Sequence, residues 1–571
     1  MAAPQPLNLS HHFSYVSKNR LPSTTKSLYK YAEIPGIANL SGGLPHFTYF
    51  PHDTLEATVA RPHRLNAGDL KSDRLFIPMH SDPIDPKQRI DLSTALQYGL
   101  ADGYPALRSF MRQFVRDHLH PNVPYDGGPE VIMTCGNTDG LSKSIELLTN
   151  IWNPDRDWVH QREGVLVEEF TYMNAIQQIT PRGLNIVGVA VDGQGMLAFG
   201  KGGLADVLEN WDFKKGRRPH ILYTIAIGQN PTGGVLSIER KKEIYALCQK
   251  FDVIIVEDEP YWNLQYPSAY ELEASYRGSS PQGSSSYRQN FNSNGKSSGF
   301  PFLDSLTPSY LSIDTEGRVV RLDTFSKTIA PGSRLGWITA QPAIIERITR
   351  ITETSTQQPS GFAQVMIAKT LMGNQTADES KLINKEDFKG WRVDGWVGWL
   401  EGLRGGYEKR MQVMCTALEE NKSIILEQLE MTGAVDDWEM VDRVQMFDFV
   451  WPKAGMFIWL EVHFETHPLR LKYSAEELSK AFWVHLTKEP HKCLISPGSM
   501  FGATPKSAAL SHNYFRLSFA PMDPNEVESL TRRLLDGFRS FWQLKELEDD
   551  EVLEVQAVTL QRSANFLGPG C

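Results

Sequence analysis

The segment from Val319 to Trp337, VVRLDTFSKTIAPGSRLGW, contains the pattern that decides the fold. A short run of β-branched and aliphatic residues leads into a polar loop, and a second apolar run, LGWIT, follows. Upstream, from Pro129, similar runs alternate with helical sequence: VIMTC, VLVEE, NIVGVAV, ILYTIA and VIIVE. Uninterrupted apolar runs are typical of strands buried on both faces. The sequence therefore predicts an α/β fold with a largely parallel sheet covered by helices, and such sheets bind ligands beyond the carboxyl ends of their strands.

Composition limits the partners of the chain. Its 571 residues are 41% hydrophobic and 22% charged, which suffices for a large core in two or more domains. A net charge of −10 disfavours general binding to nucleic acid or anionic membranes, because both need a basic surface. No apolar run approaches the roughly 20 residues of a membrane span, and the N-terminus lacks a signal-peptide core, so we expect a cytoplasmic protein that acts on small molecules. Five scattered cysteines predict neither disulfides nor a metal site.

Two stretches interrupt the regular pattern. Residues Ser275 to Gly299 are rich in serine, glycine and asparagine, and we expect a flexible surface insertion because almost no apolar side chains are available to bury. Residues Asn374 to Trp399 are irregular in sequence, but Trp391, Trp396 and Trp399 are large enough that we expect them to pack against another part of the protein.

The rest of the chain predicts the domain organisation. A helical stretch, EKRMQVMCTALEENKSIILEQLE (408–430), precedes the strand-like runs KAGMFIWLEV and NYFRLSFA and a last helix near 525–548. This mixed pattern suits a smaller C-terminal α+β domain. We expect an N-terminal arm and part of the small domain over residues 1–74, the large domain over 75–365, the small domain over 366–545 and a flexible tail over 546–571.

The residue types with the clearest chemistry follow the run VVRLD. Thr324, Ser326 and Lys327 come at its end, and Arg334 follows in a glycine-containing loop. Pyridoxal-5'-phosphate (PLP) requires such a group, because a lysine binds it as a Schiff base while hydroxyls and an arginine bind its phosphate. Taken alone, the segment is equally compatible with a solvated surface lysine.

Two upstream segments support the same chemistry. VIIVEDEPYWNL ends a buried run at Asp258 and Tyr261, and a carboxylate there would keep the pyridine nitrogen of PLP protonated. ILYTIAIGQNPTGGVLS contains a turn that presents the amide of Asn230 to an anionic ring oxygen. Each has a plain alternative, since aspartates often cap helices or turns and NPTG is compatible with an ordinary turn.

Together, in the order NPTG, D-x-P-Y and S-K with a following arginine, these segments closely resemble the fold-type I PLP-dependent aminotransferases. Within them the chain is most similar to the group of fungal aromatic amino acid aminotransferases and kynurenine/2-aminoadipate aminotransferases. The matching stretches are SGGLPHFTYFP (41–51), ALQYG (95–99), GNTDGLSK (136–143), RKKEIYAL (240–247), KAGMFIWL (453–460) and NYFRLSF (513–519). The resemblance implies PLP as cofactor, a homodimer, and a large domain with a mostly parallel seven-stranded sheet beside a smaller α+β domain.

The resemblance also implies the role of each site residue. Lys327 would carry the cofactor and move a proton, Asp258 would pair with the pyridinium nitrogen, and Tyr172 would stack on the ring; these are the expected catalytic residues. The other expected cofactor ligands are Asn137, Thr138, Thr324, Ser326 and Arg334 at the phosphate, Asn230 and Tyr261 at the ring oxygen, and Tyr98 reaching across a dimer interface. The expected substrate ligands are Arg516 at the α-carboxylate, Asn230, and Gly42 and Gly43, where a Cβ would intrude.

The function that the resemblance implies is ping-pong transfer of an amino group from an aromatic or 2-aminoadipate-type amino acid to a 2-oxo acid such as 2-oxoglutarate, in amino acid metabolism or in the biosynthesis of a specialised metabolite. In relatives an N-terminal arm adapts the pocket to both substrates, and Phe13 to Tyr31 is the corresponding segment here. A PLP-dependent lyase or decarboxylase on the same scaffold is one alternative. A non-enzymatic aminotransferase-like sensor is another, although the roughly 40 residues before SGGLP are too few for a DNA-binding domain.

Overall fold

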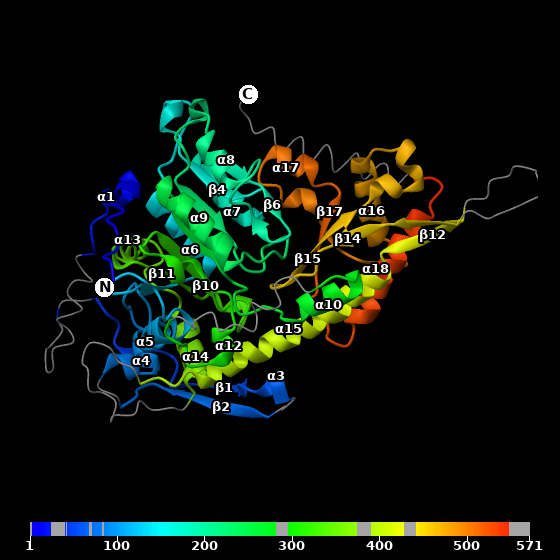
Figure 1. Cartoon of the computed structure of the whole chain (residues 1–571). Coiled ribbons are helices and arrows are strands. Elements are labelled where there is room, and N and C mark those ends of the chain that lie inside the picture. The colour runs from blue at the N-terminus through cyan, green and yellow to red at the C-terminus, as the bar shows by residue number, and fades with distance from the viewer. Residues whose placement is uncertain are drawn as a thin grey trace, which may run out of the picture.

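The computed structural model describes residues 3–23, 40, 43–67, 71–82, 85–280, 295–373, 390–427 and 441–547 (Figure 1). Its centre is a seven-stranded sheet with the order β3-β11-β10-β9-β8-β4-β5. All of its strands run parallel except β11, which is antiparallel to both neighbours. The expected α/β fold with a mostly parallel sheet is therefore confirmed. The strands are β3 (Glu130–Thr134), β4 (Gly164–Glu168), β5 (Asn185–Val189), β8 (Ile221–Thr224), β9 (Ile254–Asp258), β10 (Val319–Thr324) and β11 (Gly336–Ala340).

Helices cover both faces of this sheet because its strands are apolar on both sides. In β9, Ile254 and Val256 enter one buried core while Ile255 enters another, as the alternation of side chains along a strand requires. The first core includes apolar side chains of α6 (Asn137–Leu148) and α13 (Pro342–Glu353), and the second includes those of α8 (Leu204–Glu209) and α9 (Ile238–Lys250). The further short elements here are α7 (Met173–Ile179), β6 (Val191–Asp192), β7 (Gly195–Met196), α10 (Ser268–Arg277) and α12 (Pro301–Asp304).

A second, antiparallel sheet of four strands lies in the C-terminal part and has the order β14-β15-β17-β16. Its strands are β14 (Phe447–Phe449), β15 (Phe457–Val462), β16 (Ser496–Pro497) and β17 (Tyr514–Ser518). The amphipathic α18 (Val527–Trp542) and α16 (Ala475–Thr487) pack aromatic side chains on it, with Phe482 and Phe538 at 4.6 Å between ring centroids. The short α17 (Pro505–Leu510) precedes β17.

One long helix, α15 (Asp394–Glu420), belongs to both halves of the molecule (Figure 1). Near its start, Trp396 and Leu400 are buried with residues of the β10–β11 region, whereas Met414 and Leu418 share a core with the C-terminal sheet. The tryptophans of the irregular stretch do pack, as expected, but residues 394–399 are the first turns of this helix and not an irregular segment.

The N-terminal part adds a separate hairpin and small helices. Strands β1 (Thr54–Ala60) and β2 (Ser72–Pro78) pair antiparallel. The helices here are α1 (Tyr15–Asn19), α3 (Arg64–Ala67), α4 (Leu92–Ala95) and α5 (Pro105–Gln113), and the later helix α14 (Gly361–Met372) packs against α4 and α5. Within the part of the chain that the structure describes, no helix is long and apolar enough to cross a membrane.

Several expected boundaries differ from the structure. The predicted helix over 408–430 ends at Glu420, and Ser423–Glu427 form β12, which pairs with β13 (Val441–Gln445). Within the expected insertion, Ser275 to Arg277 complete α10, and Ser298 is buried and its backbone N–H donates to Asp304 Oδ1 at 2.8 Å. Residues 281–294, 374–389 and 548–571 lie outside the described residues. Residues 74 and 365 lie inside β2 and α14, and the division into an arm, a large domain and a small domain stays a prediction.

Candidate active site

The predicted residues converge at one edge of the main sheet. Strands β8, β9 and β10 are parallel neighbours, so their carboxyl ends lie together. Asp258 is the last residue of β9, Lys327 follows the end of β10, and Asn230 follows the end of β8. The order of the strands explains why segments that are distant in sequence meet here.

Asp258 is a buried carboxylate with two hydrogen-bond donors. Asn137 Nδ2 donates to its Oδ1 at 2.6 Å, and the Tyr223 hydroxyl donates to its Oδ2 at 2.8 Å. Burial raises the pKa of the Asp258 carboxyl to about 6, although both donors lower it because they favour the charged form. The carboxylate is therefore mostly ionised at neutral pH and is positioned to hold a cationic N–H.

Lys327 presents a free amine in the same region. The side chain is half-buried, and its Nζ makes no hydrogen bond or ion pair with the residues that the structure describes. Burial, and then the positive charge of Arg516, lower the pKa of this amine. A lysine with a lowered pKa is more often neutral, which is the form that attacks an aldehyde or accepts a proton.

Tryptophans hold the loop that carries Lys327. The buried ring of Phe325 lies 5.0 Å from Trp337 and 6.0 Å from Trp396 between ring centroids. Trp399 Nε1 donates to the Thr328 carbonyl at 2.7 Å. The start of α15 thus packs against the residues on either side of Lys327 and fixes their backbone.

An anion site can form beside this loop. Thr324 Oγ1 lies 2.9 Å from Ser326 Oγ, and Arg334 Nη2 donates to the Cys135 carbonyl at 3.1 Å. Helix α6 begins at Asn137 without a side-chain cap, so the N–H groups of its first turn are available to an anion. Gly136 has φ +88°, and a Cβ there would lie 2.6 Å from Arg334 Nη2, so this close approach of backbone and guanidinium requires glycine.

Arg516 is a cation that lacks an anionic partner. Its Nη1 donates to Asn230 Oδ1 at 2.7 Å, and its guanidinium lies 4.2 Å and 4.7 Å from the ring centroids of Phe457 and Phe501. Its Nε is buried without a hydrogen-bond partner, and it forms no ion pair with any described carboxylate. Burial lowers the pKa of the guanidinium. A ligand carboxylate would supply the missing negative charge.

Two tyrosines complete the cluster. Tyr172 precedes α7, and its hydroxyl accepts from Asn174 Nδ2 at 2.8 Å. Burial and then the charge of Asp258 raise the pKa of Tyr172. Tyr261 is 4% exposed, with its ring edge toward Phe457, and burial followed by Asp258 raises its pKa also. Both therefore remain neutral and can donate a hydrogen bond at neutral pH.

Some expected residues are not joined to this cluster. Thr138 is exposed at the start of α6, and Tyr98 is 57% exposed, with a backbone N–H that donates to Gln97 Oε1. An added Cβ at Gly43 would meet no described protein atom within 4 Å, so the close approach to the substrate that the resemblance implies stays a prediction. Gly42 lies outside the described residues.

The structure shows a contact of Asn137 and a residue, Tyr223, that the sequence did not single out. The Asn137 side chain donates to Asp258, and its part in the phosphate site, through the backbone N–H at the start of α6, stays a prediction. Tyr223 was not predicted. It lies in the apolar run ILYTIA, where a tyrosine is indistinguishable from a core residue until β8 and β9 pair.

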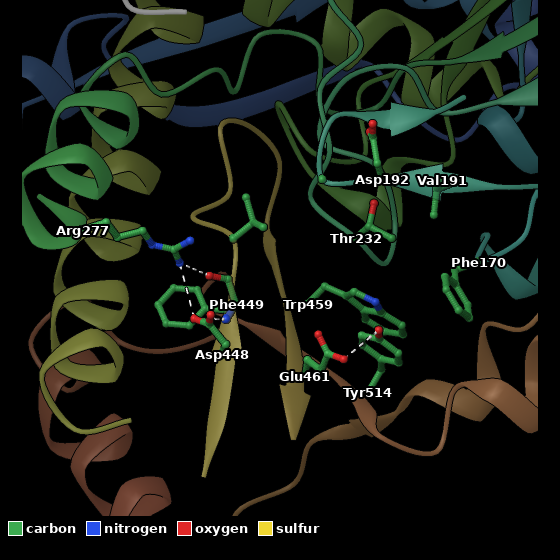
Figure 2. Close-up of a pocket in the computed structure, with 12 residues that line it drawn as sticks. Phe170, Val191, Asp192, Thr232, Arg277, Asp448, Phe449, Trp459, Glu461 and Tyr514 are labelled. Atoms are coloured by element: carbon green, nitrogen blue, oxygen red, sulfur yellow. Dashed lines mark hydrogen bonds and ion pairs between the residues drawn. The ribbon is translucent and has the colours of Figure 1, made fainter. Parts of the chain in front are cut away.

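A cavity of about 260 Å³ lies next to this cluster but contains none of the predicted residues. Trp459 and Tyr514 stack with their ring centroids 5.4 Å apart. Figure 2 shows this pair among the residues that line the cavity, which also include Phe170 and Thr232 of the NPTG turn. Trp459 pairs in register with Arg516 across β15 and β17, so the cavity adjoins the wall of the Arg516 site.

Comparison with known proteins gives consistent matches. Residues 64–534 match the family model for aminotransferase class I and II. An aromatic amino acid aminotransferase of Schizosaccharomyces pombe is 36% identical over 81% of this chain and 83% of its own length. An L-tyrosine:2-oxoglutarate aminotransferase of Tapinella panuoides is 33% identical over 81% of this chain and 76% of its own length. The crystal structure of an aminotransferase from Candida albicans superimposes with a TM-score of 0.73 at 30% identity, covering 95% of this chain and 100% of that one.

Proposed function

The chain belongs to the family of class I and II aminotransferases and is a PLP-dependent transaminase, and on this premise we propose that it moves the amino group of an aromatic or 2-aminoadipate-type amino acid to a 2-oxo acid such as 2-oxoglutarate. One observation carries the proposal. The Arg516 guanidinium, which forms no ion pair with a described carboxylate, lies near enough to the free amine of Lys327 to lower the pKa of that amine.

The residues fit PLP. Asn137 Oδ1 and Arg516 Nε are buried polar atoms without partners among the described residues, α6 begins without a side-chain cap, and Lys327 Nζ, which contacts no described acceptor, can bind an aldehyde carbon. Thr324, Ser326 and Arg334, with the N–H groups of Asn137 and Thr138, would bind the phosphate. When bound, PLP supplies an electron sink that stabilises negative charge at the substrate Cα.

Each role in the reaction is assigned to a side chain of this protein. The Asp258 carboxylate would hold the proton on the pyridine nitrogen, and Tyr261 and Asn230 would donate to the ring oxygen. Lys327 Nζ would remove and return the proton at the substrate Cα, and its lowered pKa suits a base. Arg516 would bind the α-carboxylate of both substrates through two parallel N–H bonds, and Tyr172 would cover the ring.

The substrate class rests on the relatives and on the walls of the site. The relatives are named for aromatic amino acids and for tyrosine with 2-oxoglutarate. In this chain Phe457 and Phe501 cover the Arg516 guanidinium, and such rings favour a large side chain over a small one.

A panel of amino donors tests the proposal. Protein loaded with PLP is mixed with phenylalanine, tyrosine, tryptophan, 2-aminoadipate, alanine or aspartate, and conversion of PLP to pyridoxamine phosphate is followed. We expect the first four to react at least about tenfold faster than alanine and aspartate, because their side chains are longer and each extra methylene in a hydrophobic pocket discriminates by about 10- to 200-fold. Efficient reaction of alanine or aspartate alone would contradict the substrate class, and release of carbon dioxide without pyridoxamine phosphate would favour the decarboxylase alternative.

We also propose that the protein is a homodimer in which Tyr98 reaches the cofactor phosphate of the neighbouring chain. Tyr98 at 57%, Phe362 at 43% and Leu100 at 37% exposure are apolar side chains of the kind that an interface buries. Mixing Tyr98→Phe chains with Lys327→Ala chains tests this. If Tyr98 acts across the interface, each hybrid has one intact site and turns over faster than either parent. If it acts within its own chain, no gain appears.

A further inference from the structure

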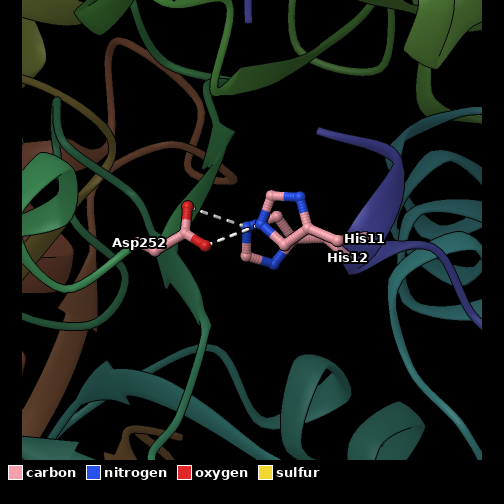
Figure 3. Close-up of side chains that lie close together, drawn as sticks. All are labelled: His11, His12 and Asp252. Carbon is pink, nitrogen blue, oxygen red and sulfur yellow. Dashed lines mark hydrogen bonds and ion pairs between the residues drawn. The ribbon is translucent and has the colours of Figure 1, made fainter. Parts of the chain in front are cut away.

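Two histidines and an aspartate meet near the amino end of β9, at the end of the strand away from the candidate active site (Figure 3). His11 and His12 lie in a short 3-10 turn, Ser10–His12, and Asp252 follows α9 just before β9. Because β9 runs from Ile254 to Asp258 at about 3.3 Å per residue, this cluster lies about 20 Å from the candidate active site.

The geometry of the three side chains suits a shared cation. His11 Nε2 lies 2.6 Å from Asp252 Oδ2, and His12 Nε2 lies 3.1 Å from Asp252 Oδ1. One ligand atom from each residue falls within 4.8 Å of the others. Figure 3 shows both imidazole rings directed at the carboxylate.

His12 supplies a second, independent indication. Its side chain is 5% exposed, and its Nε2 is buried without a hydrogen-bond partner among the described residues, although the carboxylate is near. This buried imidazole nitrogen is directed at the Asp252 carboxylate, where a cation shared by the two groups would bind.

We propose that His11, His12 and Asp252 bind one divalent transition-metal cation, with zinc as the best fit. Two imidazole nitrogens and a carboxylate, with a water in the fourth position, form a common zinc ligand set. Bonds of about 2.0–2.1 Å in a tetrahedron place ligand atoms about 3.4 Å apart, so the two distances between histidine and Asp252 need to lengthen by less than about 1 Å. His11 is 57% exposed and Asp252 50% exposed on the side-chain scale, so both can move and water can enter.

The neighbouring charges are compatible with a cation. Arg318 Nη1 lies 3.5 Å from Asp252 Oδ1, but this guanidinium also pairs with Glu316 at 2.5 Å and donates to the Val253 carbonyl at 2.9 Å. His220 stacks on His12 with its Nε2 near the Leu148 carbonyl, and Lys18 Nζ donates to the His11 carbonyl. The C-terminal end of α9 adds a partial negative charge.

Such a cation would crosslink the N-terminal segment that contains His11 and His12 to the main sheet. The Leu7 N–H donates to the Glu316 carbonyl at 2.8 Å, and the Ser14 N–H donates to the Leu147 carbonyl at 2.7 Å, on either side of the histidines. Phe13 is buried in the first core. The first half of the expected mobile arm, Phe13 to Ser23, is therefore docked, and residues 24–39 lie outside the described residues.

Calorimetric titration of untagged, chelator-treated protein with zinc chloride tests the proposal. We expect saturable binding of one zinc per chain at micromolar concentration. His11→Ala and Asp252→Asn should each weaken it at least about tenfold, because even indirect partners of a metal change affinity by about 10- to 100-fold. His160→Ala removes another exposed histidine outside the cluster and should leave the affinity unchanged.

Two further readouts separate a site from adventitious binding. Cobalt(II) should give the visible absorption of a tetrahedral complex in the parent chain but not in Asp252→Asn. Zinc should slow amide hydrogen exchange over residues 7–17 in the parent only. Because both signals are independent of turnover, failure of the aminotransferase proposal would not affect them. Absence of saturable micromolar binding, or equal affinity in the two cluster variants and the parent, would overturn the proposal.

Discussion

Tyr223→Phe removes one hydroxyl from Asp258 and leaves the packing of β8 intact. The hydroxyl donates at 2.8 Å to a carboxylate that is 5% exposed, so water cannot replace it readily. A hydrogen bond to a charged group contributes about 1.5–3 kcal/mol, and one pKa unit corresponds to about 1.4 kcal/mol. The pKa of Asp258, about 6 in the parent protein, should therefore rise by about 1–2 units in the variant.

The pH dependence of PLP binding reports this shift. Burial raises the pKa of Asp258 above its unfolded value, so the neutral carboxyl stabilises the cofactor-free fold at low pH, and this contribution is lost as pH rises through about 6. PLP requires the ionised form, so its affinity should rise with pH and level off above about 6 in the parent. In Tyr223→Phe the plateau should begin about 1–2 pH units higher.

Fluorescence titration of the cofactor-free protein with PLP from pH 5 to pH 8.5 measures both curves. Tyr245→Phe is the matched control, because its hydroxyl also donates to a buried aspartate, Asp314, at 2.9 Å but away from the site. The control should lose similar stability without moving the PLP curve. Equal midpoints for Tyr223→Phe and the parent, or the same displacement in the control, would refute the role given to Tyr223.

Three further outcomes are expected. Borohydride reduction should fix PLP on Lys327 in a tryptic map, and Lys327→Ala should keep PLP but lose turnover by at least about 10²- to 10⁴-fold; label on another lysine would contradict this. Arg516→Lys should raise the KM of both substrates by about 10- to 100-fold in steady-state assays, because one amine cannot replace two parallel bonds; an unchanged KM would exclude the carboxylate role. Trp399→Phe should lower the free energy of unfolding in urea by about 1 kcal/mol, because the bond to the Thr328 carbonyl is lost, whereas exposed Trp158→Phe should not.

Local sequence was sufficient for the main sheet. The run VIIVE became Ile254–Asp258 and VVRLD became Val319–Thr324, because apolar runs buried on both faces have few other structures available. It was insufficient for Ser423–Glu427, which continued the apolar spacing of a helix but pairs as a strand with Val441–Gln445. That choice depends on a partner strand, and periodicity within one segment contains no information about it.

The contacts that complete the site depend on long-range pairing. Tyr223 and Asp258 are brought together by the parallel register of β8 and β9, and Trp399 reaches Thr328 from a different helix. His12 and Asp252 are separated by most of the N-terminal half of the chain. In each case the residue has no distinguishing neighbours in the sequence, and its contact forms only when distant segments come together in the fold.

Helix α15 connects the two parts of the protein that contain Lys327 and Arg516. Its 27 residues span about 40 Å. Its first turns pack against the loop that contains Lys327, and its last turns share a buried core with the sheet that contains Arg516. The distance between the Lys327 amine and the Arg516 guanidinium therefore depends on a helix that packs at both ends and not on surface loops. Gly405 and Gly406 lie between the anchored ends, where an added Cβ would touch nothing, and each weakens the helix by about 1 kcal/mol relative to alanine. Because kinks in long helices usually occur at such residues, we expect any bending of α15 to occur at this pair, which would change the distance between Lys327 and Arg516.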